Sequence, residues 1–250
     1  MVIRSLGLFL VEVSAGTSLL LLFFPVRLLG KGFFSLHGFI AGTALLLAAV
    51  VSSGDRTVVG MVSLAMLALY TLFSRIGLQR FARIFLAAAA AGLYGTLAAA
   101  ARTLDPDRWG WIFAGEALGS LLFGSVLLTM NLGHWYLISK SLPASLLFRA
   151  AAGYAAACVA RAAFLAVVAF RPANAGAWEA LTSLDRDGLF FLFRVLWGIL
   201  GPLALSYFIF QTSRMRSNQA ATGLLYVALV FVLIGELLSA YLTVLTRFPA

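Results

Sequence analysis

Ionisable side chains are scarce in this 250-residue sequence, and their scarcity excludes the soluble protein classes. Only 11% of the residues are charged, whereas 62% are hydrophobic. Ordinary soluble domains carry about 25% charged residues. No Pro/Gly/Ser-rich linker divides the chain, and no polar stretch is long enough to fold as a separate domain. The composition therefore predicts a single polytopic transmembrane domain over residues 1–250.

Cysteine and lysine are almost absent. Because Cys158 is the only cysteine, disulfides, CxxC pairs, thiolate iron–sulfur sites and covalent c-type haem attachment are excluded within the chain. Lys31 and Lys140 both lie in predicted turns, which excludes a Schiff-base lysine in the middle of a span. The sequence also lacks a phosphate-binding glycine loop, a nucleophile elbow and an HExxH motif. Soluble-type enzyme chemistry therefore has no support.

The net charge of +9 comes from basic residues in short turns beside apolar runs. In that position basic side chains meet lipid headgroups and set topology, so membrane lipid is the expected partner and nucleic acid is not. The apolar run after Arg4 lacks a convincing cleavage site, so we interpret it as a retained first span.

Eight apolar stretches are long enough to cross about 30 Å of hydrocarbon as helices. We therefore predict an all-α integral membrane protein, a bundle of about eight transmembrane helices. The longest connection, 171–187, is expected to hold an interfacial helix around Trp178. The predicted spans are Ser5–Pro25, Phe33–Ser53, Thr57–Ser74, Phe81–Ala101, Gly110–Gly133, Ala144–Phe170, Gly188–Gln211 and Gln219–Thr246.

The charges of the turns predict the orientation. An even number of spans places both termini on one side, together with Arg4, Arg56, Arg102, Arg108, Arg171, Arg186, Arg247 and every acid outside the spans. The opposite side is free of acids and carries Arg27, Lys31, Arg75, Arg80, Arg83, Lys140, Arg149, Arg214 and Arg216. Because basic residues favour the cytoplasm, we predict non-cytoplasmic termini in a multi-pass protein of the cell inner (cytoplasmic) membrane.

Apart from Arg83 and Arg149 near the span ends, five charged residues interrupt the spans, and these five are the candidate catalytic residues. A charge in hydrocarbon costs at least about 2.5–3.5 kcal/mol, so such residues are candidates for a functional site. Their positions predict one layer in the outer half of the bilayer. An odd carboxyl among two arginines suits proton handling; the alternative is two structural ion pairs with a neutral third acid. The five are Glu12, Glu116, Arg161, Arg194 and Glu236.

Aromatic residues and a predicted kink accompany this layer. Tyr94, Tyr154 and Tyr241 are expected to line an outward-opening pocket, as is Trp197. Pro202 follows Gly198 and Gly201 in the seventh span, where proline removes a backbone hydrogen bond, so a kink is expected there.

The two histidines lie at a common depth near the predicted cytoplasmic face. His37 begins the second span and His134 ends the fifth, beside Trp135 and Tyr136. These four residues are the candidate cofactor-binding set. Three interpretations stay open: two axial ligands of one haem b, contact with a quinone, or a structural role at the interface, where Trp and Tyr also gather. His37 and His134 would ligate metal only if a b-type haem is bound.

Two functional hypotheses follow. The favoured one is a membrane subunit of a respiratory or related electron-transfer complex, which binds quinone or quinol, and one haem b if the histidines ligate it. The redox centres would then lie on other subunits of the complex, and the Glu/Arg layer would handle protons. The alternative is a small proton-coupled secondary transporter, in which the same layer binds protons or substrate. An assembly factor or a purely structural subunit remains open as well.

Overall fold

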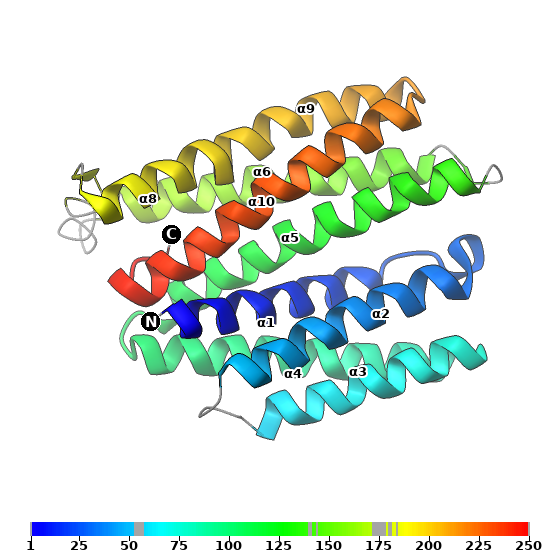
Figure 1. The fold of residues 1–250 in the computed structure, drawn as a ribbon, viewed down its shortest axis with the longest axis horizontal. Coiled ribbons are helices and arrows are strands. Elements are labelled where there is room, and N and C mark those ends of the chain that lie inside the picture. Colours follow the sequence, from blue (N-terminus) through cyan, green and yellow to red (C-terminus); the bar gives the residue numbers. More distant parts are fainter. Residues whose placement is uncertain are drawn as a thin grey trace.

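The computed structural model is an all-α bundle of eight membrane-spanning helices (Figure 1), as the sequence predicts. It describes residues 2–52, 58–139, 142–143, 145–171, 179, 182–183 and 185–249, and no strand occurs among them. The spans are α1 (Val2–Leu21), α2 (Val26–Val51), α3 (Val58–Ile76), α4 (Gln79–Leu104), α5 (Trp109–Ile138), α6 (Ser145–Ala169), a seventh built from α8 (Arg186–Val195) and α9 (Gly201–Arg214), and α10 (Asn218–Thr246).

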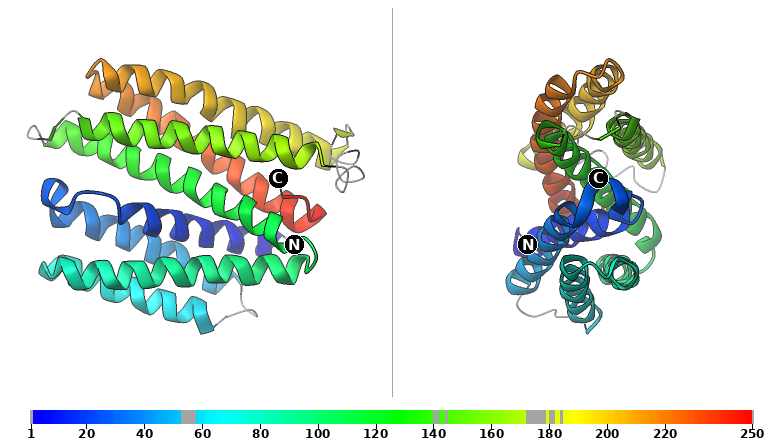
Figure 2. Two further views of the ribbon diagram at one scale, coloured as in Figure 1. Left: turned by 180° about the vertical axis from the view of Figure 1, so that it is seen from behind. Right: turned by 90° about the vertical axis from the view of Figure 1, so that its right-hand side faces the viewer.

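Helices α1 and α5 form the centre of the bundle. In Figures 1 and 2 the spans α2 to α4 lie on one side of this pair, and α6 to α10 lie on the other. The central two are also the most buried of the eight spans. The outer helices direct large apolar side chains outward, for example Phe39 on α2 and Phe208 on α9, as a lipid environment requires. Both chain ends lie at the same end of the bundle (Figure 1), as eight spans demand.

Small residues bring the two central helices into backbone contact. A Cβ added to Gly16 of α1 would lie 1.7 Å from the carbonyl oxygen of Ser120 on α5. A Cβ added to Gly124 would lie 2.4 Å from the carbonyl carbon of Gly16. Any larger side chain would push the helices apart, so these glycines set the closest approach between the two sides of the bundle.

The boundaries of the second span differ from the prediction. Helix α2 starts at Val26 rather than Phe33, but Gly30 interrupts it with φ 72° and ψ 173°. Only glycine adopts this backbone conformation readily, so Val26–Leu29 is a separate turn before the span. The interfacial helix expected around Trp178, and the positions of Lys140 and Arg56, lie outside the described residues.

The irregularity expected in the seventh span is a widened helical turn. Leu196–Leu200 form a π-helical turn, and Gly201 N–H donates to the Leu196 carbonyl five residues earlier. Pro202 follows in the first turn of α9, where its missing N–H breaks the regular ladder. Gly198 lies in this turn, and its Cβ would approach the Cα of Gly235 to 2.6 Å. The turn therefore packs tightly against α10.

Candidate proton-binding site

Glu236 is the centre of the charged layer and is bound by two arginines. Arg161 Nη2 on α6 lies 3.1 Å from Glu236 Oε2, and Arg194 Nη2 on α8 lies 3.0 Å from Oε1. All three side chains are at most 1% exposed. Arg161 also donates to Ser239 Oγ over 2.7 Å, one turn along α10. Burial opposes ionisation of this carboxyl, whereas both guanidinium groups favour its charged form.

Arg194 connects this carboxylate with the π-helical turn. Its Nη1 donates to the Gly198 carbonyl over 3.2 Å. Its Nη2 is close to Glu236 Oε1, but the N–H groups do not point at that oxygen. The second contact is therefore an ion pair without an aligned hydrogen bond. Glu236 and the carbonyl of an irregular turn thus share one guanidinium.

Glu12 and Glu116 form the other part of the layer. Each is 2% exposed, and their carboxyl groups share a side-chain hydrogen bond between α1 and α5. Since ionised carboxylates only accept, such a bond needs a proton on one of the two. Oε2 of each residue has no hydrogen-bond partner among the described residues. This pair, unlike Glu236, makes no close ion pair with a described arginine.

Gly119 allows the two parts of the layer to meet. A Cβ on this residue would lie 2.5 Å from Glu236 Oε2 and 3.5 Å from Glu12 Oε2. The structure therefore brings the five predicted residues together from α1, α5, α6, α8 and α10. Three carboxyls face two guanidinium groups, so one bound proton makes the cluster neutral. We refer to these five residues as the charge cluster.

Hydroxyl groups surround the charge cluster. Tyr94 OH lies 2.8 Å from Ser120 Oγ, one turn after Glu116 on α5. Thr243 on α10 interacts with the Glu116 carboxyl. Sequence reasoning named Tyr94 but missed Ser120, Ser239 and Thr243. Helical periodicity could have found them, because each lies three, four or seven residues after a buried glutamate and so on the same helix face.

The other aromatic candidates lie apart from the charge cluster. Tyr154 OH donates to the Pro202 carbonyl over 3.2 Å, and the Tyr241 ring packs edge-on against Phe190. Trp197, which we expected to line a pocket beside the kink, is 43% exposed and packs edge-on against Phe231. The π-helical turn directs this side chain toward the outside of the bundle instead.

The two histidines occupy different environments. His37 is fully buried, and its ring nitrogens lie 2.7 Å from the Phe33 carbonyl oxygen and 3.0 Å from Asn131 Nδ2. His134 is exposed, and its Nδ1 lies 3.4 Å from Tyr226 OH on α10. Both nitrogens of His37 are thus occupied by protein groups. Axial ligation of a haem by this residue would require that the contact with Asn131 break.

The two aromatic residues that follow His134 make contacts within the bundle: Tyr136 bonds to the start of α6, and Trp135 packs on α2. Tyr136 OH donates to the Pro143 carbonyl and accepts from Leu147 N–H. Trp135 packs edge-on against Phe33 at 5.7 Å between ring centroids. Contact of these residues with a quinone or a haem stays a prediction. No group of three or more His, Cys, Asp or Glu side chains in the described part of the chain could hold a metal ion.

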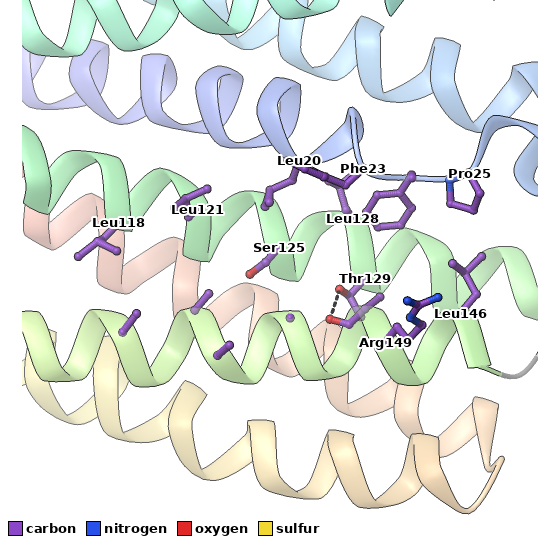
Figure 3. A pocket seen from close by; sticks show the side chains of 16 residues that line it. Leu20, Phe23, Pro25, Leu118, Leu121, Ser125, Leu128, Thr129, Leu146 and Arg149 are labelled. Carbon is purple, nitrogen blue, oxygen red and sulfur yellow. Dashed lines mark hydrogen bonds between the residues drawn. The ribbon is translucent and has the colours of Figure 1, made fainter.

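The described part of the structure contains a polar pocket and an apolar groove. One of about 400 Å³ lies at the end of the bundle that holds the termini, and it is lined by Arg4, Thr103, Leu104, Val244 and Arg247. We call it the outer pocket. Val244 of this lining directly follows Thr243 on α10, which interacts with the Glu116 carboxyl. The second is an apolar groove of about 670 Å³ between α1, α5 and α6 (Figure 3).

Comparisons with known proteins add no family assignment. No protein-family model, curated protein or solved structure matches this chain.

Proposed function

We propose that this protein is a proton-coupled transporter of the cytoplasmic membrane, in which the Glu12–Glu116 pair binds the transported proton. One observation carries the proposal: the two carboxyls contact each other inside the bundle, while both buried arginines serve Glu236. Two adjacent carboxylates away from water cannot both be ionised. The pair therefore takes up a proton and releases it when its surroundings change.

In this proposal, protons reach the pair from the outer pocket. A polar cavity at the bilayer surface fills with water, and Val244 of its lining follows Thr243, which interacts with Glu116. Arg4 and Arg247 make the lining positive. A positive pocket beside a proton site favours an anionic substrate that enters with the proton.

The π-helical turn supplies the coupling. Arg194 contacts both Glu236 and the Gly198 carbonyl. A change in the charge of the cluster would therefore change the strength of the hydrogen bond from Arg194 to the π-helical turn. π-Helical turns inside longer helices are frequent at functional sites. A helix with such a turn can alternate between two arrangements at a lower cost than a regular one.

The same site could serve an electron-transfer subunit, which is the hypothesis that the sequence favours. Transport is the better supported of the two, because His37, Trp135 and Tyr136 make packing and hydrogen-bond contacts within the bundle. These contacts give His37, Trp135 and Tyr136, three of the four candidate cofactor-binding residues, a structural role that needs no cofactor.

Infrared difference spectroscopy tests the proton site. Purified protein at neutral pH should contain a protonated buried carboxyl, seen as a carbonyl band that is absent from E12Q or E116Q. Glu179→Gln, an exposed acid outside the spans, is the matched control and should keep the band. A wild-type protein without this band would overturn the assignment of the pair.

Proteoliposomes with an internal pH dye test the transport function. A panel of carboxylates, phosphate, amino acids and sugars is added outside. At least one compound should acidify the lumen of wild-type vesicles and leave E12Q vesicles at the level of empty liposomes. If no compound distinguishes wild type from E12Q while the infrared band is present, the proton site stands and the transport function fails.

A further inference from the structure

The groove between α1, α5 and α6 is lined mainly by apolar side chains. Helix α6 forms one wall, the end of α1 and the turn after it (Leu20–Pro25) form the other, and α5 forms the floor (Figure 3). Its two hydroxyl groups are already engaged: Ser125 Oγ donates to the Leu122 carbonyl and Thr129 Oγ1 to the Ala150 carbonyl. A polar solute would therefore find no free hydroxyl donor on the floor, whereas a hydrocarbon chain needs none.

Small residues on α6 create the space. Gly153, Ala156, Ala157 and Ala160 face the groove, and a Cβ added to Gly153 would meet no atom within 4 Å. In lipid, a trough of this kind on the side of a bundle is filled by an acyl chain, because an empty one would lose dispersion contacts on both sides.

The groove is long enough to cross one leaflet. Its lining on α6 runs from Leu146 to Ala160, fourteen residues apart. At 1.5 Å per residue this is about 21 Å, which exceeds half of a hydrocarbon core of about 30 Å and leaves room for a headgroup at the surface end. One acyl chain therefore extends from the surface to the bilayer midplane along the groove.

A cation marks the surface end. Arg149 is exposed, and its guanidinium extends from α6 toward the side where Pro25 lies (Figure 3). No carboxylate of the described residues forms a salt bridge with it. This end is the predicted cytoplasmic side, where anionic headgroups attract basic residues. The charge selects a phosphate-bearing anionic headgroup at the point where the acyl chain leaves the groove.

From these observations we infer that the α1–α5–α6 groove is a binding site for an anionic phospholipid. One acyl chain lies along Gly153 and Ala157, and the headgroup phosphate pairs with Arg149. The lipid fills the gap between the walls and so joins the two sides of the bundle at the cytoplasmic end. This site is separate from the charge cluster, so the inference stands whatever becomes of the proton site.

Native mass spectrometry of the purified full-length protein tests the inference. After delipidation, phosphatidylglycerol or phosphatidylcholine with the same acyl chains is titrated back. Wild type should retain one phosphatidylglycerol in preference to phosphatidylcholine. Arg149→Gln should weaken phosphatidylglycerol binding about fivefold, the effect of one basic residue near a membrane surface, and leave phosphatidylcholine unchanged. Arg75→Gln, an exposed cation on the same side but away from the groove, is the control.

A second variant tests the groove itself. Gly153→Leu places a side chain in open space within it and should remove the retained lipid of either class. Gly223→Leu, on α10 and also without a neighbour within 4 Å of its Cβ, should keep it. The inference is overturned if Gly153→Leu binds as much phosphatidylglycerol as wild type, or if Arg149→Gln keeps the full preference. A quinone as the retained molecule would also overturn it.

Discussion

Arg161 on α6 and Glu236 on α10 are 75 residues apart in the chain and form an ion pair of 3.1 Å inside the bundle. Neither side chain is more than 1% exposed. The pair is the centre of the charge cluster, since Arg194 reaches the same carboxylate from the opposite side of Glu236. A buried contact of this kind has large consequences when one partner is removed.

Glu236→Gln should destabilise the protein strongly. The substitution leaves two buried guanidinium groups without their carboxylate, and the loss of one partner of a buried pair costs about 3–5 kcal/mol. Thermal unfolding in detergent should show a large decrease in Tm. Glu12→Gln is the matched control and should cost far less, because Glu12 makes no close ion pair with a described arginine. Equal losses for the two variants would contradict the central role of Glu236.

Gly16→Ala should separate the two central helices. Its Cβ would lie 1.7 Å from the Ser120 carbonyl oxygen, so α1 and α5 must move apart at a cost of about 3 kcal/mol. Gly42→Ala on α2 has no neighbour within 4 Å and should be neutral or slightly stabilising. Unfolding temperatures of the two variants check this directly. A stable Gly16→Ala protein would mean that the close approach of the helices is not required.

Asp105 should make the turn between α4 and α5 sensitive to acid. Partial burial opposes its ionisation, but hydrogen bonds from the backbone and guanidinium of Arg108 outweigh this and hold the pKa of Asp105 below its usual range. Its stabilising effect is therefore present above about pH 4 and is lost as the pH falls through the lower folded-state pKa.

Asp105→Asn removes the partly exposed ion pair with Arg108 and should lower the unfolding temperature at neutral pH by the equivalent of about 1 kcal/mol. The difference from wild type should disappear under strongly acidic conditions. Asp107→Asn changes an acid in the same turn whose side chain makes no described hydrogen bond, and it serves as the control. If the difference in unfolding temperature between Asp105→Asn and wild type persists in acid, the carboxylate is not its source.

The orientation can be read from single cysteines in a Cys158→Ala background. With non-cytoplasmic termini, Asp107→Cys at the α4–α5 turn should react with a membrane-impermeant maleimide in intact cells. Ser217→Cys at the α9–α10 turn should react only after permeabilisation. Both positions are exposed. The reverse labelling pattern would place the outer pocket and the charge cluster on the cytoplasmic side.

A reduced-minus-oxidised absorbance spectrum separates transport from electron transfer. Because Asn131 and the Phe33 carbonyl occupy both nitrogens of His37, we expect gently purified protein to lack a b-type band. A band that disappears in His134→Ala would instead support haem ligation and would favour the electron-transfer hypothesis over the transporter hypothesis. Identification of any co-purifying quinone or redox subunit completes the measurement.

Periodicity and charge were enough to predict the helices, because each span responds to its own contact with lipid. The eight spans, the five buried charges and the irregularity around Pro202 follow from runs of residues near one another in the chain. The prediction failed where a side chain's direction depends on neighbouring helices. Trp197, for example, lies on the outside of the bundle.

The sequence by itself determined that three acids and two arginines lie within the membrane-spanning helices, and it predicts that they share a common depth. Only the tertiary structure decided which of them are partners. Depth follows from residue number within a span, but pairing depends on how each helix is rotated and how closely it packs. Gly119 and the glycine contacts of α1 with α5 set those rotations and distances. They place both arginines within ion-pair distance of Glu236 and place Glu12 beside Glu116, the pair that we propose binds a proton.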